Sequence, residues 1–181
     1  MVELEAFERG DFDRLIGWIG SADELMQWAG PIFRWPLDRA QLDRYLAAAE
    51  GPGAVRRIWR AVDGGETVGH VELNAIERTH RTATLSRVLV RPGLRGRGTG
   101  AAMVRRVLAV AFDEMRLHRV DLFVFDFNAP AIACYEGLGF QREGRLRDYR
   151  RLGDRYLSSL LMSMLEDEWR AGPGTAAGSE G

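Results

Sequence analysis

The feature that most restricts the fold of this chain is an apolar strand that leads through a glycine-rich turn into a long helix. The strand ends at Val88-Leu89-Val90, the turn reads Arg95-Gly96-Arg97-Gly98-Thr99-Gly100, and apolar residues then recur at helical spacing up to Met115. The first amides of a helix lack intrahelical partners, and glycines let an anion approach the backbone. We therefore expect the amides of residues 95–100 to bind a pyrophosphate.

Two well-known phosphate-binding loops do not fit this turn. The preceding segments, 57–62 and 67–76, flank the turn-forming residues 63–66 and predict a hairpin, with 82–90 as the next antiparallel strand. A dinucleotide-binding fold does not begin with such a meander, and the acidic ribose-binding residue that closes its following strand is missing here. A Walker loop requires lysine, and all 25 basic residues are arginine. The alternative to phosphate binding is a simple tight connection.

The remaining segments predict an α/β (α+β) fold in which one mixed sheet contains a parallel crossover. Residues 2–8 alternate as a first strand, and Asp11, Ser21 and Asp38 are the expected N-caps of three helices. The later elements are expected as a strand over 120–125, a helix over 128–138 and strands over 140–148 and 155–164. We assign residues 1–170 to one domain and 171–181 to a disordered tail.

Composition limits the function classes. With 181 residues, 46% of them hydrophobic, the chain is long enough for one substantial core. The formal charge of -1 supplies no overall field for nucleic acid or an anionic membrane, so neither is an expected partner. The single cysteine, Cys134, excludes an internal disulfide and a cysteine-rich metal site; we expect no metal and a cytoplasmic location.

A second pattern lies downstream of the glycine turn. Asn128 precedes Tyr135 by seven residues, and Gly139-Phe140 follows. Together with the Arg95, Gly98 and Gly100 spacing, this arrangement resembles motifs A and B of the GNAT N-acetyltransferases. The resemblance extends over residues 2–165, and in its three-helix opening the chain is most similar to the branch that includes the ribosomal-protein-serine acetyltransferases.

The resemblance implies a GNAT fold, with a mixed sheet of about seven strands, flanking helices and a splayed parallel pair around the coenzyme. It implies acetyl-CoA as cosubstrate, with the main chain of Val88 to Val90 pairing with the pantetheine arm and residues 95–100 holding the pyrophosphate. Asn128 would contact the coenzyme as well as cap its helix. Tyr135 would protonate the departing CoA thiolate, although ordinary core packing is the alternative for this side chain.

The group that removes a proton from the amine is less evident. Many relatives carry a glutamate early in the coenzyme strand, where this sequence reads Thr82 to Ser86 without a carboxylate. Alternation on the preceding strand places His70, Glu72 and Asn74 on one face, so Glu72 or His70 is a candidate base acting through water. The alternative is that these residues form only the wet face of the sheet.

We therefore expect an N-acetyltransferase that acetylates a primary amine by direct attack in a ternary complex, because Cys134 lacks a positive neighbour that would make it a nucleophile. The acceptor is an amine-bearing small molecule or a protein N-terminus. Trp28, Phe33 and Trp35 form either an aromatic wall over the acceptor or an anchor for their loop. We also expect a homodimer. The alternatives are a non-catalytic CoA-binding or sensing domain, an interaction protein that merely keeps the fold, and use of another acyl group such as succinyl.

Overall fold

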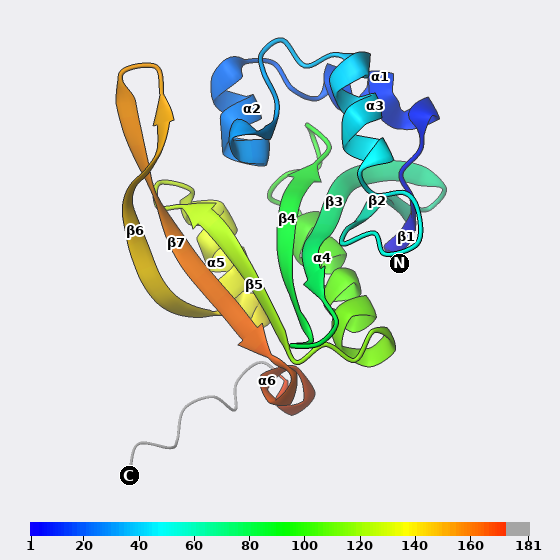
Figure 1. Ribbon diagram of the computed structural model, residues 1–181, viewed down its shortest axis with the longest axis vertical. Helices are drawn as coiled ribbons and strands as arrows, with labels where there is room; N and C mark the ends of the chain where they lie inside the picture. Colours follow the sequence, from blue (N-terminus) through cyan, green and yellow to red (C-terminus); the bar gives the residue numbers. More distant parts are fainter. Residues whose placement is uncertain (173–181) are drawn as a thin grey trace.

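The computed structural model describes residues 1–172, which form a seven-stranded mixed sheet with helices on both faces (Figure 1). The strands are β1 (Glu3–Ala6), β2 (Arg57–Asp63), β3 (Glu66–Glu77), β4 (Thr82–Val90), β5 (Arg119–Phe125), β6 (Gln141–Leu152) and β7 (Arg155–Leu165). The helices are α1 (Phe12–Gly17), α2 (Ala22–Ala29), α3 (Arg39–Ala47), α4 (Thr99–Ala109), α5 (Ala129–Leu138) and α6 (Glu166–Ala171). The predicted tail lies outside the described residues, apart from its first two positions.

The strand order β1-β2-β3-β4-β5-β7-β6 confirms the predicted meander and crossover. All neighbours are antiparallel except β4 and β5, which are joined through α4 and run parallel. The glycine turn therefore lies at the end of the first parallel strand, where the chain leaves the sheet. This position is the one that the sequence predicted for it.

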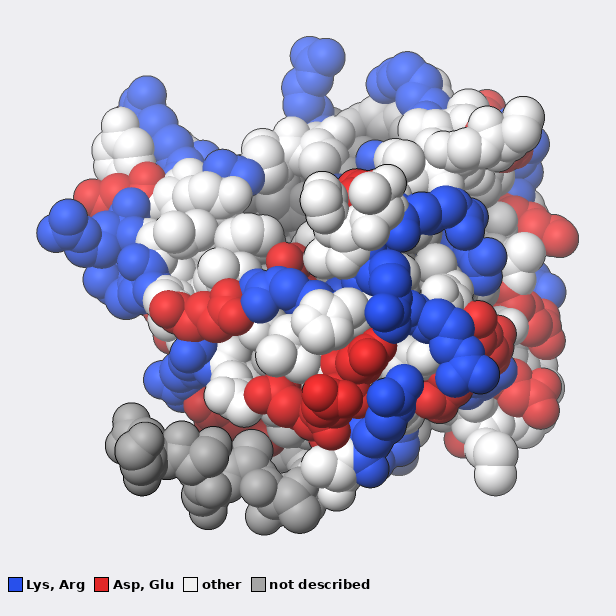
Figure 2. All heavy atoms as spheres, turned by 60° about the horizontal axis from the view of Figure 1, so that its bottom comes forward, with Lys and Arg blue, Asp and Glu red and all other residues white. Residues whose placement is uncertain are grey.

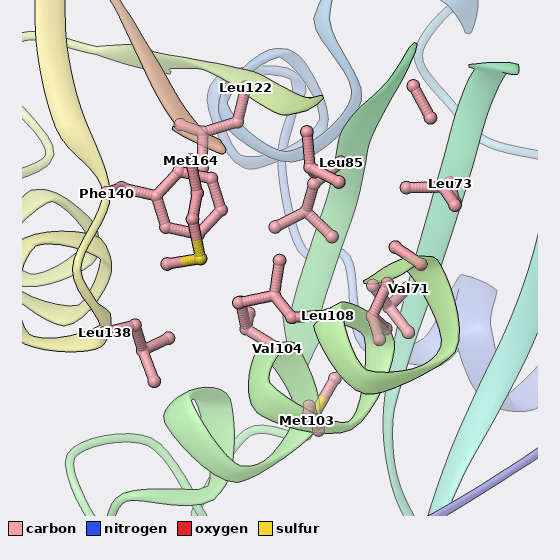
Figure 3. Close-up of a cluster of buried hydrophobic side chains, with 14 of the residues drawn as sticks. Val71, Leu73, Leu85, Met103, Val104, Leu108, Leu122, Leu138, Phe140 and Met164 are labelled. Carbon is pink, nitrogen blue, oxygen red and sulfur yellow. The ribbon is translucent and has the colours of Figure 1, made fainter. Parts of the chain in front are cut away.

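Two hydrophobic clusters cover the two faces of the sheet. The larger one packs α4 and α5 against β3, β4, β5 and β7, with Val104 and Leu108 of α4 close to Leu85 and Val71 of the sheet (Figure 3). The smaller cluster joins helices α1 to α3 to the opposite face through Ile58 and Leu89. Both faces of β3 are consequently buried, and the N-terminal helices lie over the half of the sheet that leads to the glycine turn.

Two of the three predicted helix caps are confirmed. Ser21 Oγ accepts from the amide of Glu24 at 3.1 Å, and Asp38 Oδ1 accepts from the amide of Gln41 at 2.8 Å. Asp11 occupies the N-cap position of α1, as predicted, but its carboxylate makes no capping bond to that helix. It instead binds Arg14 at 2.5 Å and Arg60 at 3.1 Å, since burial of an acidic side chain requires charged partners.

Single-turn helices complete the described chain: 3-10 helices at Arg9–Asp11 and Gly30–Ile32, and a π-helix at Val110–Glu114. The π turn extends α4, which explains why the apolar spacing continued to Met115. The predicted strand over 140–148 is longer in the structure, reaching Leu152. Within residues 1–172, no helix is long and apolar enough to cross a membrane.

Charges of both signs are interspersed on the surface (Figure 2). The arginines of β6 and β7 illustrate this pairing: Arg142 binds Glu136 at 2.6 Å, Arg145 binds Asp126 at 2.7 Å and Arg155 binds Asp23 at 2.9 Å. The sheet edge formed by β6 is therefore rich in arginine, and carboxylates neutralise part of this charge.

Candidate active site

The two parallel strands separate at the centre of the sheet. They pair only from Thr82–Leu85 against Arg119–Leu122, and beyond these residues β4 and β5 diverge (Figure 1). A cleft of about 270 Å³ lies in this opening. It is lined by residues of α2 and the following turn on one side, by β4 and β5 at its base, and by α5 and β6 on the other side.

A bulge in β4 shapes the base of the cleft. Glu72 pairs with Ser86 and His70 pairs with Leu89, so Arg87 and Val88 together face a single residue of β3. Arg87 adopts φ 51°, a left-handed conformation that side chains other than glycine rarely take. The bulge changes which side chains face α4: Leu85 lies in the larger cluster before it, and Val88 and Val90 pack against that cluster after it, while Leu89 faces the N-terminal helices.

The glycine turn presents its backbone openly. Gly96 and Gly98 have φ values of 74° and 83°, and a Cβ added at either position would meet no atom within 4 Å. Gly98 is the N-cap of α4 and provides no side-chain cap, so the first amides of the helix are left for another acceptor. Arg95 and Arg97 are exposed beside them. Open space, free amides and positive charge fit a pyrophosphate.

Helix α5 brings the second predicted motif to the cleft. Asn128 caps α5 through a hydrogen bond that its Oδ1 accepts from the amide of Ala131 at 3.4 Å, and both Asn128 and Tyr135 line the cleft. Tyr135 packs edge-to-face on Phe140, with ring centroids 5.7 Å apart. Within residues 1–172 its hydroxyl makes no hydrogen bond. Burial raises the pKa of the Tyr135 phenol, so the group keeps its proton at neutral pH and is available as a donor.

Cys134 precedes Tyr135 and is half-buried. Burial raises the pKa of its thiol, and no ion pair offers a compensating positive charge among the described residues. A thiol that stays protonated is a poor nucleophile. The surroundings of Cys134 therefore favour a route without an acyl-enzyme.

Glu72 and His70 lie beneath the N-terminal helices and do not line the cleft. Both side chains are fully buried, because α2 and α3 cover this face of β3. The alternative that they lie on a solvent-exposed face of the sheet is therefore wrong. Glu72 Oε2 accepts from the hydroxyl of Tyr45 at 2.6 Å and from Arg87 at 2.6 Å. Arg87 does line the cleft, and Glu72 thus contacts the cleft only through this guanidinium.

His70 is enclosed by aromatic rings, with Phe7 and Trp28 in edge-to-face contact at 4.7 and 5.5 Å. Its Nε2 lies 3.2 Å from the Tyr45 hydroxyl. Burial, with a smaller contribution from the charge of Arg87, lowers the pKa of His70 to about 3. The imidazole is therefore neutral at physiological pH.

We expect this neutral histidine to make stability depend on pH. The pKa of His70 is near 6.5 in the unfolded chain and about 3 in the folded protein. Below pH 6.5 the unfolded chain therefore binds a proton that the folded protein does not. The contribution of His70 to the free energy of unfolding is highest above pH 6.5 and declines as the pH falls. Between pH 7 and pH 5.5 the wild type should lose about 1 kcal/mol more unfolding free energy than His70→Gln. Urea unfolding at both pH values measures this, and equal losses in the two proteins would contradict it.

The aromatic residues Trp28, Phe33 and Trp35 were expected either to form a wall over the acceptor or to anchor their loop, and the structure supports a part of each interpretation. Trp28 and Phe33 are buried and stacked at 5.7 Å, and the Trp28 indole donates to the carbonyl of Arg87 at 2.9 Å, so this ring anchors the segment while lining the cleft. Trp35 is 46% exposed and lies outside the cleft. Sequence reasoning missed Phe123, Tyr149 and Arg150 as cleft residues. The period-two pattern offered no signal for the last two, because β6 is irregular there.

The chain is similar to known acetyltransferases. The acetyltransferase (GNAT) family model matches residues 22–140. The spermidine N(1)-acetyltransferase of Vibrio cholerae is 30% identical over 167 residues, which cover 92% of this chain and 94% of that protein. The L-amino acid N-acetyltransferase AaaT of Escherichia coli is 28% identical over 119 residues, covering 65% and 72% of the two chains.

Two further matches span most of the fold. The putative ribosomal N-acetyltransferase YdaF of Bacillus subtilis is 27% identical over 151 residues, covering 73% of this chain and 82% of that protein. The crystal structure of the spermidine N-acetyltransferase from Vibrio cholerae in complex with CoA and spermine is 26% identical and superposes with a TM-score of 0.81, covering 93% and 98% of the two chains.

Proposed function

The chain belongs to the GNAT acetyltransferase family and is an N-acetyltransferase that uses acetyl-CoA, and we propose that it acetylates a primary amine by direct attack in a ternary complex. The observation that carries this proposal is the cleft between the separated strands β4 and β5. It places the Tyr135 ring, the β4 bulge and the cap of α5 around one opening. The relatives named above act on acceptors as different as spermidine and amino acids, so the family does not by itself fix the acceptor.

The proposed coenzyme site combines two parts of the chain. The amides at the start of α4, with Arg95, Gly96, Arg97, Gly98, Thr99 and Gly100, hold the pyrophosphate. The main chain of β4 from Val88 to Val90, left without a parallel partner, offers hydrogen bonds to the pantetheine amides. Asn128, at the cap of α5, lies on the opposite wall.

The chemistry needs an activated carbonyl and a proton for the leaving sulfur, and acetyl-CoA supplies a thioester when it binds. In the proposed mechanism a main-chain N–H of the β4 bulge, between Val88 and Leu89, polarises the thioester carbonyl. The amine nitrogen forms a bond to this carbon, the carbon–sulfur bond breaks, and Tyr135 gives its phenolic proton to the departing thiolate. The ammonium proton released by the amine passes to solvent, since no carboxylate or imidazole lines the described cleft.

Glu72 remains in the proposal, and its contacts favour a positioning role over that of a base. Its Oε2 already accepts two short hydrogen bonds, and the carboxylate reaches the cleft only through Arg87. A buried carboxylate held in this way fixes the guanidinium and, with it, the strained residue of the β4 bulge. Direct proton transfer to Glu72 stays a prediction.

We also propose that the enzyme is a cytoplasmic homodimer. Support for pairing comes from the apolar side chains of Ile32 and Trp35, each 46% exposed in the segment after α2. The single free cysteine fits a reducing compartment. Light scattering should give about twice the mass of the 20.3 kDa chain, and a monomer at high concentration would contradict pairing.

A thiol-release assay tests the proposed function. With acetyl-CoA and a panel of primary amines, we expect amine-dependent release of CoA thiol that rises with pH as the amine loses its proton. Tyr135 does not oppose this rise, because its raised pKa keeps the phenol protonated while the amine titrates. Binding of CoA without thiol release in the presence of any amine would favour the non-catalytic alternative. Faster turnover of succinyl-CoA than of acetyl-CoA would show that the transferred group is succinyl.

A further inference from the structure

The charges that line the cleft are all positive. Arg87 and Arg150 line it, and no aspartate or glutamate does so within the described residues. A polycationic acceptor would meet like charge in this opening and no carboxylate to offset it. The charge of the cleft is therefore unsuited to a polyamine.

The two arginines differ in what they already bind. Arg87 is neutralised by Glu72 at 2.6 Å, and its side chain is only 10% exposed. Arg150 has no carboxylate partner within residues 1–172; it donates to the carbonyl of Tyr149 at 3.2 Å and lies over the Tyr149 ring, 3.7 Å from the centroid. Its neighbour Arg151, by contrast, is bound to Asp154. Arg150 thus brings an uncompensated guanidinium with unused donors to the cleft.

An irregularity in β6 explains why Arg150 reaches the cleft together with the residue before it. Leu146 pairs with Ser159 and Arg150 with Leu157, so three residues of β6 face Ser158 alone. Asp148 adopts φ 50°, and its amide donates to Ser158 Oγ at 3.0 Å. Adjacent residues of a regular strand point to opposite faces, whereas a bulge redirects them. Strain of this kind is commonly held at functional sites.

Aromatic surface lies beside this cation. Phe123 of β5 is 46% exposed and stacks on Tyr149 with centroids 5.7 Å apart and an interplanar angle of 19°. Trp28 contributes to the opposite wall. The exposed Phe123 ring, stacked on the half-buried Tyr149 next to a guanidinium without a carboxylate partner, forms a surface for a ligand that is apolar along its body and negative at one end.

We propose that the acceptor is a small primary amine that also carries a carboxylate and an apolar or aromatic body. Arg150 binds the carboxylate, and Phe123 and Tyr149 receive the apolar part, while the amine faces the bulge of β4. This assignment rests on the proposed acetyl transfer and adds to it the class of amine. The reaction is unchanged: the amine nitrogen gains the acetyl group and the sulfur leaves as the thiol.

The test compares L-phenylalanine, L-phenylalaninamide and spermidine as acceptors in the thiol-release assay. The amide keeps the shape of the amino acid and removes the negative charge. Its amine is less basic, so more of it is unprotonated at the assay pH, and this difference alone would favour the amide over L-phenylalanine. We expect kcat/KM for L-phenylalanine to exceed that for the amide by about 10- to 100-fold, the range for a charged hydrogen bond, with spermidine slowest. Arg150→Gln should bring the ratio close to one, whereas Arg151→Gln, its exposed neighbour, should preserve it.

Several outcomes would overturn the assignment: a wild-type ratio near or below one, spermidine as the best acceptor, or a ratio that Arg150→Gln leaves intact. If Arg150→Gln weakened the binding of CoA as much as it lowered kcat/KM for L-phenylalanine, this side chain would hold the coenzyme instead of the acceptor. Calorimetry tests the recognition of the carboxylate independently of turnover. Preferential binding of N-acetyl-L-phenylalanine over N-acetyl-L-phenylalaninamide to the CoA-saturated protein supports it even if no amine is turned over, and equal binding overturns it.

Discussion

Gly98→Asp should weaken the binding of CoA by about 100-fold, because the new carboxylate would occupy the same amides that receive the pyrophosphate and would repel it. Gly98 is the N-cap of α4, and a Cβ at this position meets no atom within 4 Å, so the side chain has room, although its φ of 83° strains any residue other than glycine. Aspartate is also a favourable residue near a helix start, which preserves α4 itself. Isothermal calorimetry of the purified protein with CoA measures the change.

Two further variants separate the effect of charge from that of the backbone. Gly98→Asn introduces a side chain of nearly the same size without the charge, and we expect it to lose only about tenfold in affinity. Gly64→Asp places the same residue at another positive-φ glycine, in the hairpin between β2 and β3, and should bind CoA normally. If Gly98→Asp bound CoA within about threefold of the wild-type affinity, the proposed placement of the pyrophosphate at this turn would be wrong.

The prediction of these elements from sequence succeeded where the information was local. The strand, glycine turn and helix around Gly98 were read correctly because turn chemistry and the change from period two to helical spacing are both contained in a short segment. The same holds for Asn128, whose capping bond follows from its position just before α5. Elements whose form depends only on their own turn or helix could thus be predicted.

Residues whose position depends on distant parts of the chain could not be placed in this way. Glu72 lies on the face of β3 that alternation predicted, but that face is buried because helix α3, some 30 residues earlier, packs over it. Arg87 reaches the cleft through a bulge with one additional residue in β4, and Tyr149 and Arg150 reach it through the irregularity in β6, where three residues face one. Such irregularities change which side chains face each side of the sheet. Polar alternation alone contains no sign of either effect.

The position of Tyr135 on α5 combines both kinds of information. Seven residues from Asn128 correspond to about two helical turns, so the spacing itself puts both side chains on one face of the helix. That this face borders the cleft follows from the separation of β4 and β5, which the structure shows and local spacing does not determine. The hydroxyl then has no hydrogen-bond partner among residues 1–172, although burial raises its pKa and keeps it protonated.

Tyr135→Phe should lower turnover by roughly 10²- to 10⁴-fold, the range expected for loss of a general acid. The substitution keeps the ring and its edge-to-face contact with Phe140, so folding and CoA affinity should remain those of the wild type. Thiol release at saturating acetyl-CoA and amine measures the change, and a pre-steady-state burst would reveal whether product release, rather than chemistry, limits the wild type. Near-wild-type turnover with chemistry rate-limiting would assign Tyr135 to packing alone. In that event solvent protonates the leaving thiolate, which its modest affinity for protons near neutral pH permits.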